Sequence, residues 1–249
     1  MVASVLTASA PTATASTASN MESQILGWMN RDRVAAGLVA YRRDSALAYV
    51  AGKRAARMAA KNYLSHSAAG PSLGYELSQN GIQWYTWGEA IGASSYPWGS
   101  QAASNLYRMW RASAPHRALL MSTGFNYVGV GVARASNGKT YASIVFTDSS
   151  DHTGAVGRNV SVSAKGTTVS YAWTGADVKL QKRTAGLRSF DVQYRVDGGT
   201  WRTIRNDTTE RGLSVANRER GHTYGFRVRA EDQRGNLGSW SSEARVSLQ

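Results

Sequence analysis

The spacing of apolar residues changes part-way along this chain, and that change limits the fold more than any other feature. Up to about residue 126 apolar residues recur at helical spacing, whereas from Arg158 onward apolar and polar residues alternate between turn signals. A length of 249 residues suits two ordinary domains. The two patterns therefore predict a first domain rich in helices and a second domain built only of strands.

The first domain is expected to be an α+β layer fold (an α-β-α sandwich) within residues 21–150, with helices ahead of a pair of strands. Asn20 is predicted to cap the first helix and Gly37 to end it. Asn137-Gly138 is a strong hairpin signal between the two strands. The inner face of the second helix is expected to hold Leu47, Val50, Ala51, Arg54, Ala55, Met58 and Ala59. The expected helices are residues 21–36, 45–61, 74–82 and 100–113, and the expected strands are 127–136 and 139–148.

The second domain, residues 158–249, is expected to be a β-sandwich, with residues 151–157 as the linker before it. About seven short alternating segments fit into its roughly 90 residues, which is the pattern of such a sandwich. Asp197-Gly198-Gly199 and Arg234-Gly235-Asn236 mark two of its hairpins.

The first 20 residues hold mainly small and hydroxyl side chains and are not expected to pack a core. Ala13-Thr14-Ala15 fits the cleavage pattern of an export signal, although the usual basic start is absent. We interpret residues 1–20 as the remnant of an export signal that begins upstream, with a disordered leader as the alternative. No later stretch approaches the roughly 18 apolar residues of a transmembrane segment.

Charge and cysteine content narrow the classes of partner and chemistry. The net charge is +13, which favours polyanions such as acidic wall polymers, anionic lipid or nucleic acid. The excess is spread evenly, with +6 over residues 1–156 (13 basic, 7 acidic) and +7 over 157–249 (16 basic, 9 acidic). Specific nucleic-acid binding is disfavoured, because the arginines of the strands alternate as a polar sheet face requires. The absence of cysteine excludes disulfides, iron–sulfur clusters and thiol catalysis.

Two family resemblances follow from motifs in a characteristic order. Residues 22–148 resemble the CAP superfamily, also called SCP domains, in its cysteine-free bacterial form, through "LSHSAAG", "GEAIG", "MWRASAPHRALLM" and "YASIVFTD". Residues 157–249 resemble a fibronectin type III domain, through Trp173, Tyr194 in "VQYRVDGG", Leu213 and Tyr224 in "HTYGFRVRAED". Together the resemblances imply an exported protein, secreted or associated with the cell wall.

The CAP resemblance implies that His66, Glu89 and His116 converge in one cleft. Eukaryotic members place a second glutamate three residues after the helix tryptophan, where this chain has Ser113. That departure weakens a hydrolytic role, because a serine cannot replace a carboxylate as base or charged ligand. Ser113 is not expected to be a nucleophile either, because no nucleophile elbow surrounds it.

Several chemistries remain open for these residues. Two imidazoles and a carboxylate can ligate Zn²⁺ and leave a position for water, and they would hold Mg²⁺ or Ca²⁺ less well. Without a metal, the pair of Glu89 and a histidine could polarise water. The alternative is structural, with His66 holding a loop and Glu89 accepting backbone N–H groups. His152 and His222 have no ligand-spaced neighbour and are expected at the surface.

Aromatic residues surround Glu89 in the sequence and suit sugar stacking or a lipid interface. Trp84 and Trp98 are expected to be partly exposed beside the cleft, and Trp87 to pack in the core. The sequence thus predicts an envelope-associated module that binds a lipid, wall polymer or metal and is tethered to a fibronectin type III spacer or adhesion domain. The alternative is a metal-dependent hydrolase that acts on peptide or peptidoglycan.

Overall fold

The computed structural model describes residues 10–249, with side chains from Ser16 onward, and divides them into two compact units. The first unit runs to Ser150 and also includes Leu180–Arg183. The second unit comprises Asp151–Lys179 and Thr184–Gln249. Among the described residues, no helix is both long and apolar enough to cross a membrane.

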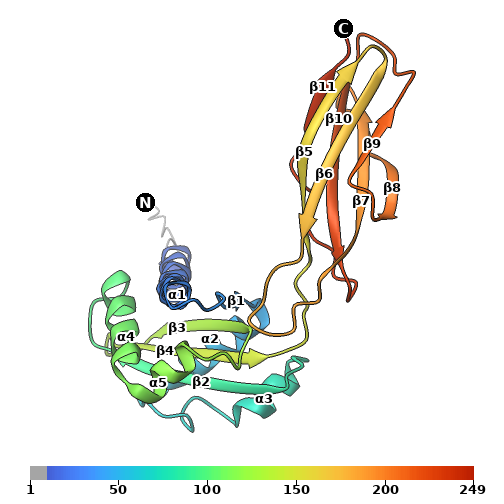
Figure 1. Cartoon of the computed structure of the whole chain (residues 1–249). Helices are drawn as coiled ribbons and strands as arrows, with labels where there is room; N and C mark the ends of the chain where they lie inside the picture. Colours follow the sequence, from blue (N-terminus) through green and yellow to red (C-terminus); the bar gives the residue numbers. More distant parts are fainter. Residues whose placement is uncertain (1–9) are drawn as a thin grey trace, which may run out of the picture. The chain divides into compact units, whose positions relative to one another are not determined.

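The first unit has one four-stranded sheet between helices, which confirms the predicted α+β layer fold (Figure 1). The strand order is β1-β3-β4-β2, in which β1 runs parallel to β3 and the other pairs are antiparallel. Its helices are α1 (Ala10–Ala35), α2 (Ser45–Lys61), α3 (Leu73–Gln79), α4 (Ser100–Ala112) and α5 (Ala114–Leu120). Its strands are β1 (Arg42–Arg43), β2 (Thr86–Ser94), β3 (Tyr127–Arg134) and β4 (Thr140–Asp148).

Alternation along β3 explains why helices cover both faces of this sheet. Val128, Val130 and Val132 face one side, where they pack with α1, α4 and α5. Gly129 and Gly131 face the other side, where a Cβ on either would lie 2.1 Å from the backbone of α2. These two glycines therefore let α2 lie directly on the strand. Every residue of β4 is buried, as a central strand covered on both faces requires.

Two local predictions for the first unit need correction. Asn20 does not cap a helix, because α1 begins at Ala10 and passes through that position. No glycine or proline occurs between residues 12 and 26 to stop the helix, and Met21 anchors it in the core. Residues 1–9 of the predicted leader lie outside the part of the chain that the structure describes. The second correction is β2, a nine-residue strand that the mixed "TWGEAIGAS" segment did not predict.

The second unit is a sandwich of a four-stranded sheet, β11-β10-β7-β8, and a three-stranded sheet, β5-β6-β9, as the alternation predicted. Aromatic residues fill its core, where the rings of Tyr171 and Phe226 stack with centroids 4.8 Å apart. Trp173 and Tyr224 are also buried there. Its strands are β5 (Val156–Lys165), β6 (Thr168–Ala176), β7 (Leu187–Val196), β8 (Arg202–Thr208), β9 (Gly212–Val215), β10 (Thr223–Asp232) and β11 (Ala244–Ser247).

Candidate functional site

Glu89 lies on β2, with its side chain on the face of the sheet that α2 covers. The pairing of Glu89 with Val145 and the burial of Val145 against α2 fix that direction. Only 3% of the side chain is exposed, and its oxygens are fully engaged. Oε1 accepts from Arg54 Nε at 2.6 Å and from Ser143 Oγ at 2.8 Å. Oε2 accepts from Arg54 Nη2 at 2.8 Å and pairs with His66 Nδ1 at 2.7 Å.

Arg54 is the centre of this buried network. It projects from α2 with 2% of its side chain exposed, and its Nη1 also donates to Glu76 Oε2 at 2.7 Å and to the Pro71 carbonyl at 2.9 Å. Arg57 pairs with the other oxygen of Glu76. Burial alone would raise the pKa of Glu89, but the hydrogen bonds from Arg54 and His66 outweigh burial and hold that pKa below its ordinary value. The carboxylate of Glu89 is therefore ionised, and both Glu76 and Glu89 are paired with arginines.

The sequence contained one signal for this network. Arg54 falls within the otherwise apolar inner face of α2, where a charged side chain needs a buried partner. Which carboxylates pair with it depends on tertiary structure, because Glu76 and Glu89 lie 22 and 35 residues away in the chain.

His66 lies in the loop after α2, with 61% of its side chain exposed. An ionised carboxylate can only accept hydrogen bonds, so Nδ1 of His66 carries the proton and donates a hydrogen bond to Glu89. In the neutral ring, Nε2 then keeps its lone pair and is the basic nitrogen. Glu89 thus orients the His66 ring and leaves Nε2 as the nitrogen that can accept a hydrogen bond.

His116 is held in a different way. It lies in α5 rather than in the expected turn, and its Nδ1 is 2.9 Å from Ser113 Oγ, at the residue that separates α4 from α5. Helix α5 covers the face of β2 opposite to α2, because a Cβ on Gly88 would touch Leu119 of α5. Burial lowers the pKa of His116, and the charge of His66 lowers it further. The two rings are therefore within electrostatic range, although they belong to elements on different faces of β2.

These positions do not form a metal-ligand set. Among the residues that the structure describes, Asp151, Asp177 and Asp232 are the one group of three or more potential ligands with atoms all within 4.8 Å of one another. His66, Glu89 and His116 are not such a group. Glu89 in addition has no oxygen lone pair left for a cation, and the positive charge of Arg54 lies against it. As they are placed here, these residues therefore do not fit a Zn²⁺ site, which was one of the chemistries left open for them.

A hollow of about 520 Å³ opens beside His66 and Glu89. Its wall also includes Ser67, Ser72, Leu73 and Trp87. Trp87, which was expected in the core, is 39% exposed. It contributes to the wall because Gly74 of α3 leaves room for its indole, where a Cβ would lie 2.9 Å from Nε1.

A second hollow of the first unit has a volume of about 580 Å³. Trp84 lines it and contacts Trp87 edge-to-face, with ring centroids 6.5 Å apart and an interplanar angle of 85°. Trp84 is 37% exposed, in agreement with its predicted partial exposure. Trp98 is also partly buried, but it packs against the α1–α4 side of the core and lines neither hollow.

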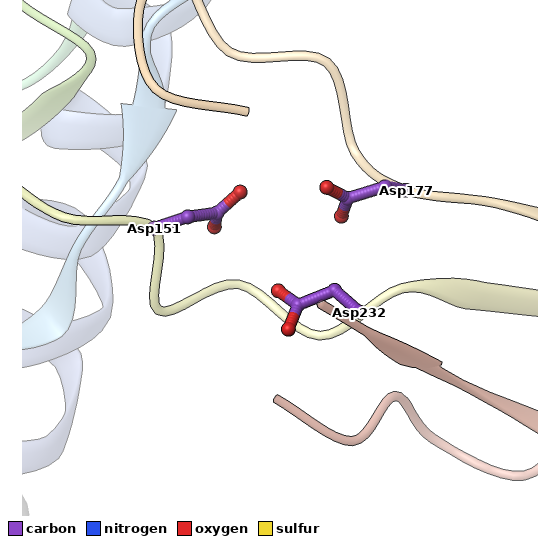
Figure 2. A group of neighbouring side chains, drawn as sticks. All are labelled: Asp151, Asp177 and Asp232. Atoms are coloured by element: carbon purple, nitrogen blue, oxygen red, sulfur yellow. The ribbon is translucent and has the colours of Figure 1, made fainter. Parts of the chain in front are cut away.

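The aspartate group belongs to the second unit and was not predicted (Figure 2). Asp151 precedes β5, Asp177 follows β6 and Asp232 ends β10, and the three carboxylates point toward one another. Carboxylate oxygens are ligands that Ca²⁺ prefers. Each carboxylate also accepts backbone N–H groups, including those of Thr153 and Gly186. Burial, together with the charges of Asp151 and Asp232, raises the pKa of Asp177. No sequence spacing could have found residues so far apart.

Comparisons with known families divide the chain in the same order. Residues 26–147 match the model of the cysteine-rich secretory protein family, named CAP, and residues 165–239 match a PBP1-like, fibronectin3-like domain. No curated protein is detectably similar to the chain.

Similar solved structures include an extracellular protein containing an SCP domain from Bacillus anthracis, at 25% identity and a TM-score of 0.47. The match covers 59% of this chain and 45% of that protein. A cysteine-rich secretory protein from Staphylococcus aureus matches at 21% identity and a TM-score of 0.43, and the match covers 53% of this chain and 39% of that protein. An Fn3-like protein from Clostridium thermocellum matches at 20% identity and a TM-score of 0.27, and the match covers 36% of this chain and 91% of that protein. The chain thus spans less than half of either of the first two proteins.

Proposed function

Because residues 26–147 form a CAP domain and residues 165–239 form a fibronectin type III-like domain, we propose that this chain is an exported bacterial envelope protein that binds a ligand without catalysis. The ligand occupies the hollow beside His66 and Glu89 in the CAP domain. The second domain serves as a spacer or adhesion module. The family is described as secretory, which supports export, and the charge of +13 favours retention by anionic envelope polymers or lipid.

The engagement of Glu89 is the observation that carries this proposal. A carboxylate that acts as a metal ligand or general base needs a free oxygen lone pair, whereas both oxygens of Glu89 already accept two hydrogen bonds each. The alternative, a metal-dependent hydrolase, requires His66, Glu89 and His116 around one ion. Among the residues that the structure describes, these three do not bring their ligand atoms within 4.8 Å of one another, which does not support that alternative. His66 Nε2 remains as the polar atom that can hydrogen-bond a ligand.

Sedimentation with purified peptidoglycan sacculi that retain their anionic polymers tests this function. The full chain is expected to pellet with sacculi at 0.15 M NaCl, less at 0.5 M because salt screens the charge, and to release no soluble wall fragments. His66→Ala should weaken binding about fivefold, the effect of one hydrogen bond of about 1 kcal/mol. His222→Ala, which removes an exposed histidine of the second unit, is the matched control and should bind as the unaltered chain does.

Two results would overturn the proposal. One is that the full chain does not pellet with sacculi at either salt concentration. The other is a release of wall fragments that depends on His66 and is restored by added Zn²⁺, which would establish the hydrolase instead.

A further inference from the structure

Each of the two hollows of the first unit is lined by one member of the contacting Trp84–Trp87 pair. Trp87 lines the hollow beside His66, and Trp84 lines the second hollow. Both rings rest on α3 at Gly74, where an added Cβ would lie 2.9 Å from Trp87 Nε1 and 3.4 Å from Trp84 Cζ2. The pair is therefore held in place by close packing, although each indole remains more than one-third exposed.

The walls of the two hollows combine apolar and aromatic side chains with polar groups, and they carry little available charge. Ser78, Gln83 and Tyr85 line the second hollow, which has no ionisable acid or base in its wall apart from the tyrosine. In the first hollow, the charges of Arg54 and Glu89 neutralise each other, which leaves the imidazole of His66 and serine hydroxyls to meet a ligand. Such a surface offers hydrogen bonds and aromatic rings together.

This combination selects among ligand classes. A polyanion would need unpaired cations, but Arg183, which lies over the Tyr85 ring at 3.8 Å, is paired with Asp148. An acyl chain that spanned both hollows would need a continuous apolar wall, whereas Ser78, Gln83 and Ser150 interrupt the apolar groups of the second hollow. A sugar ring has one face of C–H groups, which can lie on an indole, and hydroxyls around its edge, which need hydrogen-bonding partners.

We propose that the two hollows and the Trp84–Trp87 pair between them form one extended site for a neutral linear glycan strand. The inference rests on the proposed function and names its ligand class. One end of the strand reaches His66 in the first hollow, sugar rings lie along the exposed indoles, and the other end enters the second hollow. Hollows of 520 and 580 Å³ are each in the size range of small-ligand pockets, so a strand of several sugars is needed to fill both.

Soluble N-acetylglucosamine oligomers of two to six units, added to the full chain, test the site by calorimetry and tryptophan fluorescence. The six-unit oligomer is expected to bind at least about tenfold more tightly than the two-unit oligomer, because only the longer one spans both hollows. Trp84→Ala should remove most of that gain, since an aromatic contact contributes about 0.5–1.5 kcal/mol, or roughly two- to tenfold. Trp84→Phe should keep part of it.

Tyr49→Ala is the matched control, because Tyr49 is an exposed aromatic of α2 that lines neither hollow. It should bind all oligomers as the unaltered chain does. Gly74→Ala, which displaces both indoles, should resemble Trp84→Ala if unfolding midpoints show that both variants remain folded. Equal affinity for short and long oligomers, or a Trp84→Ala variant with an unchanged gain, would overturn the glycan site.

The outcomes separate this inference from the proposed function. If oligomers fail to bind while sacculi still pellet in a His66-dependent manner, the glycan site is wrong and the envelope function stands. If oligomers bind through Trp84 while sacculi never pellet, the envelope function is wrong and the glycan site stands.

Discussion

Both units of this protein gather arginines into a cluster, but they do so in opposite environments. In the first unit, Arg54 lies in the interior with 2% of its side chain exposed and shares Glu76 and Glu89 with its neighbours. In the second unit, three arginines and two tryptophans form a stack in which each guanidinium lies over an indole ring. We call this stack the arginine–tryptophan ladder; its members are Arg195, Trp201, Arg227, Trp240 and Arg229.

The ladder is half-buried and only partly compensated by acids. Arg227 lies between the two indoles, 4.3 Å from the Trp201 centroid and 4.6 Å from the Trp240 centroid. Arg195 and Arg229 pair with Glu243 and Asp191, whereas Arg227 donates to the amide oxygen of Gln193. Burial, together with the like charges of Arg195 and Arg229, lowers the pKa of Arg227.

The difference shows how solvent access decides what an arginine cluster can tolerate. Water and salt can compensate a half-exposed guanidinium, so a ladder that lacks one carboxylate survives. No such compensation reaches Glu89, so the buried network must be complete. The complete network also occupies both oxygens of Glu89 with two hydrogen bonds each, so the same packing affects both stability and the character of the site.

Removal of Arg54 should have the largest effect. Arg54→Met leaves the buried carboxylate of Glu89 without its counterion and should destabilise the first unit by about 3–5 kcal/mol. Denaturant unfolding followed by NMR signals of each unit measures this loss. The double variant Arg54→Met, Glu89→Gln should recover part of it, because a neutral amide is less costly to bury. A loss below about 1 kcal/mol would break the contrast between the two clusters.

Removal of the central ladder cation should have a smaller effect. Arg227→Met keeps an apolar stem between the indoles but loses two cation–π contacts, at about 0.5–1 kcal/mol each for partly exposed sites. The thermal unfolding of the second unit should therefore shift downward by the equivalent of about 1–2 kcal/mol. Arg205→Met, at an exposed arginine paired with Glu210, is the control and should change stability less. Equal effects would show that the stack adds nothing to stability.

The stability of both units should fall at low pH, and added salt should affect the two clusters differently. The pKa values of Glu89 and Glu243 are both lowered in the folded protein, the latter to about 2 by hydrogen bonds from Arg195 and Arg245. A lowered carboxyl pKa contributes stability that is present above the unfolded value, about 4.5, and is lost as pH falls through the folded value. Both units should therefore weaken below about pH 4.5.

Added NaCl should then reduce the contribution of Glu243, whose side chain is 15% exposed, more than that of Glu89, whose side chain is 3% exposed. Thermal midpoints of each unit at pH 7, 4 and 3, with 0.05 and 0.5 M NaCl, measure this difference. A salt effect of equal size in both units at pH 7 would contradict it.

His222 should give the smallest effect. The hydrogen bond to Asp197 and the charge of that carboxylate raise the pKa of His222. A raised histidine pKa contributes stability below the unfolded value, about 6.5, that is lost as pH rises through the folded value. NMR titration should therefore find His222 titrating above His116, whose pKa is lowered. His222→Gln should make the second unit less sensitive to pH between 6 and 8. Titration of the two rings in the reverse order would refute this.

The pattern of residues alone predicts the two-part architecture and one of its turns. The change from helical to alternating spacing separated an α+β unit from a β-sandwich, because each pattern can bury its apolar face in only one kind of layer. Asn137-Gly138 placed a turn between β3 and β4, where Gly138 has a φ of +85°. The start of α1 was missed because the small residues before Asn20 neither favour nor forbid a helix strongly, and β2 was missed because its side chains do not alternate.

Only the tertiary structure decided the chemistry of the candidate site. The motifs identified His66 and Glu89, but the pairing of β2 with β4 turned Glu89 toward α2, where Arg54 and Ser143 use its lone pairs. His116 lies on α5, the helix that covers the opposite face of β2. The aspartate group of the second unit comes from three separate segments of the chain and likewise exists only in the fold. Side-chain direction relative to a sheet is set by strand pairing, which local sequence does not encode.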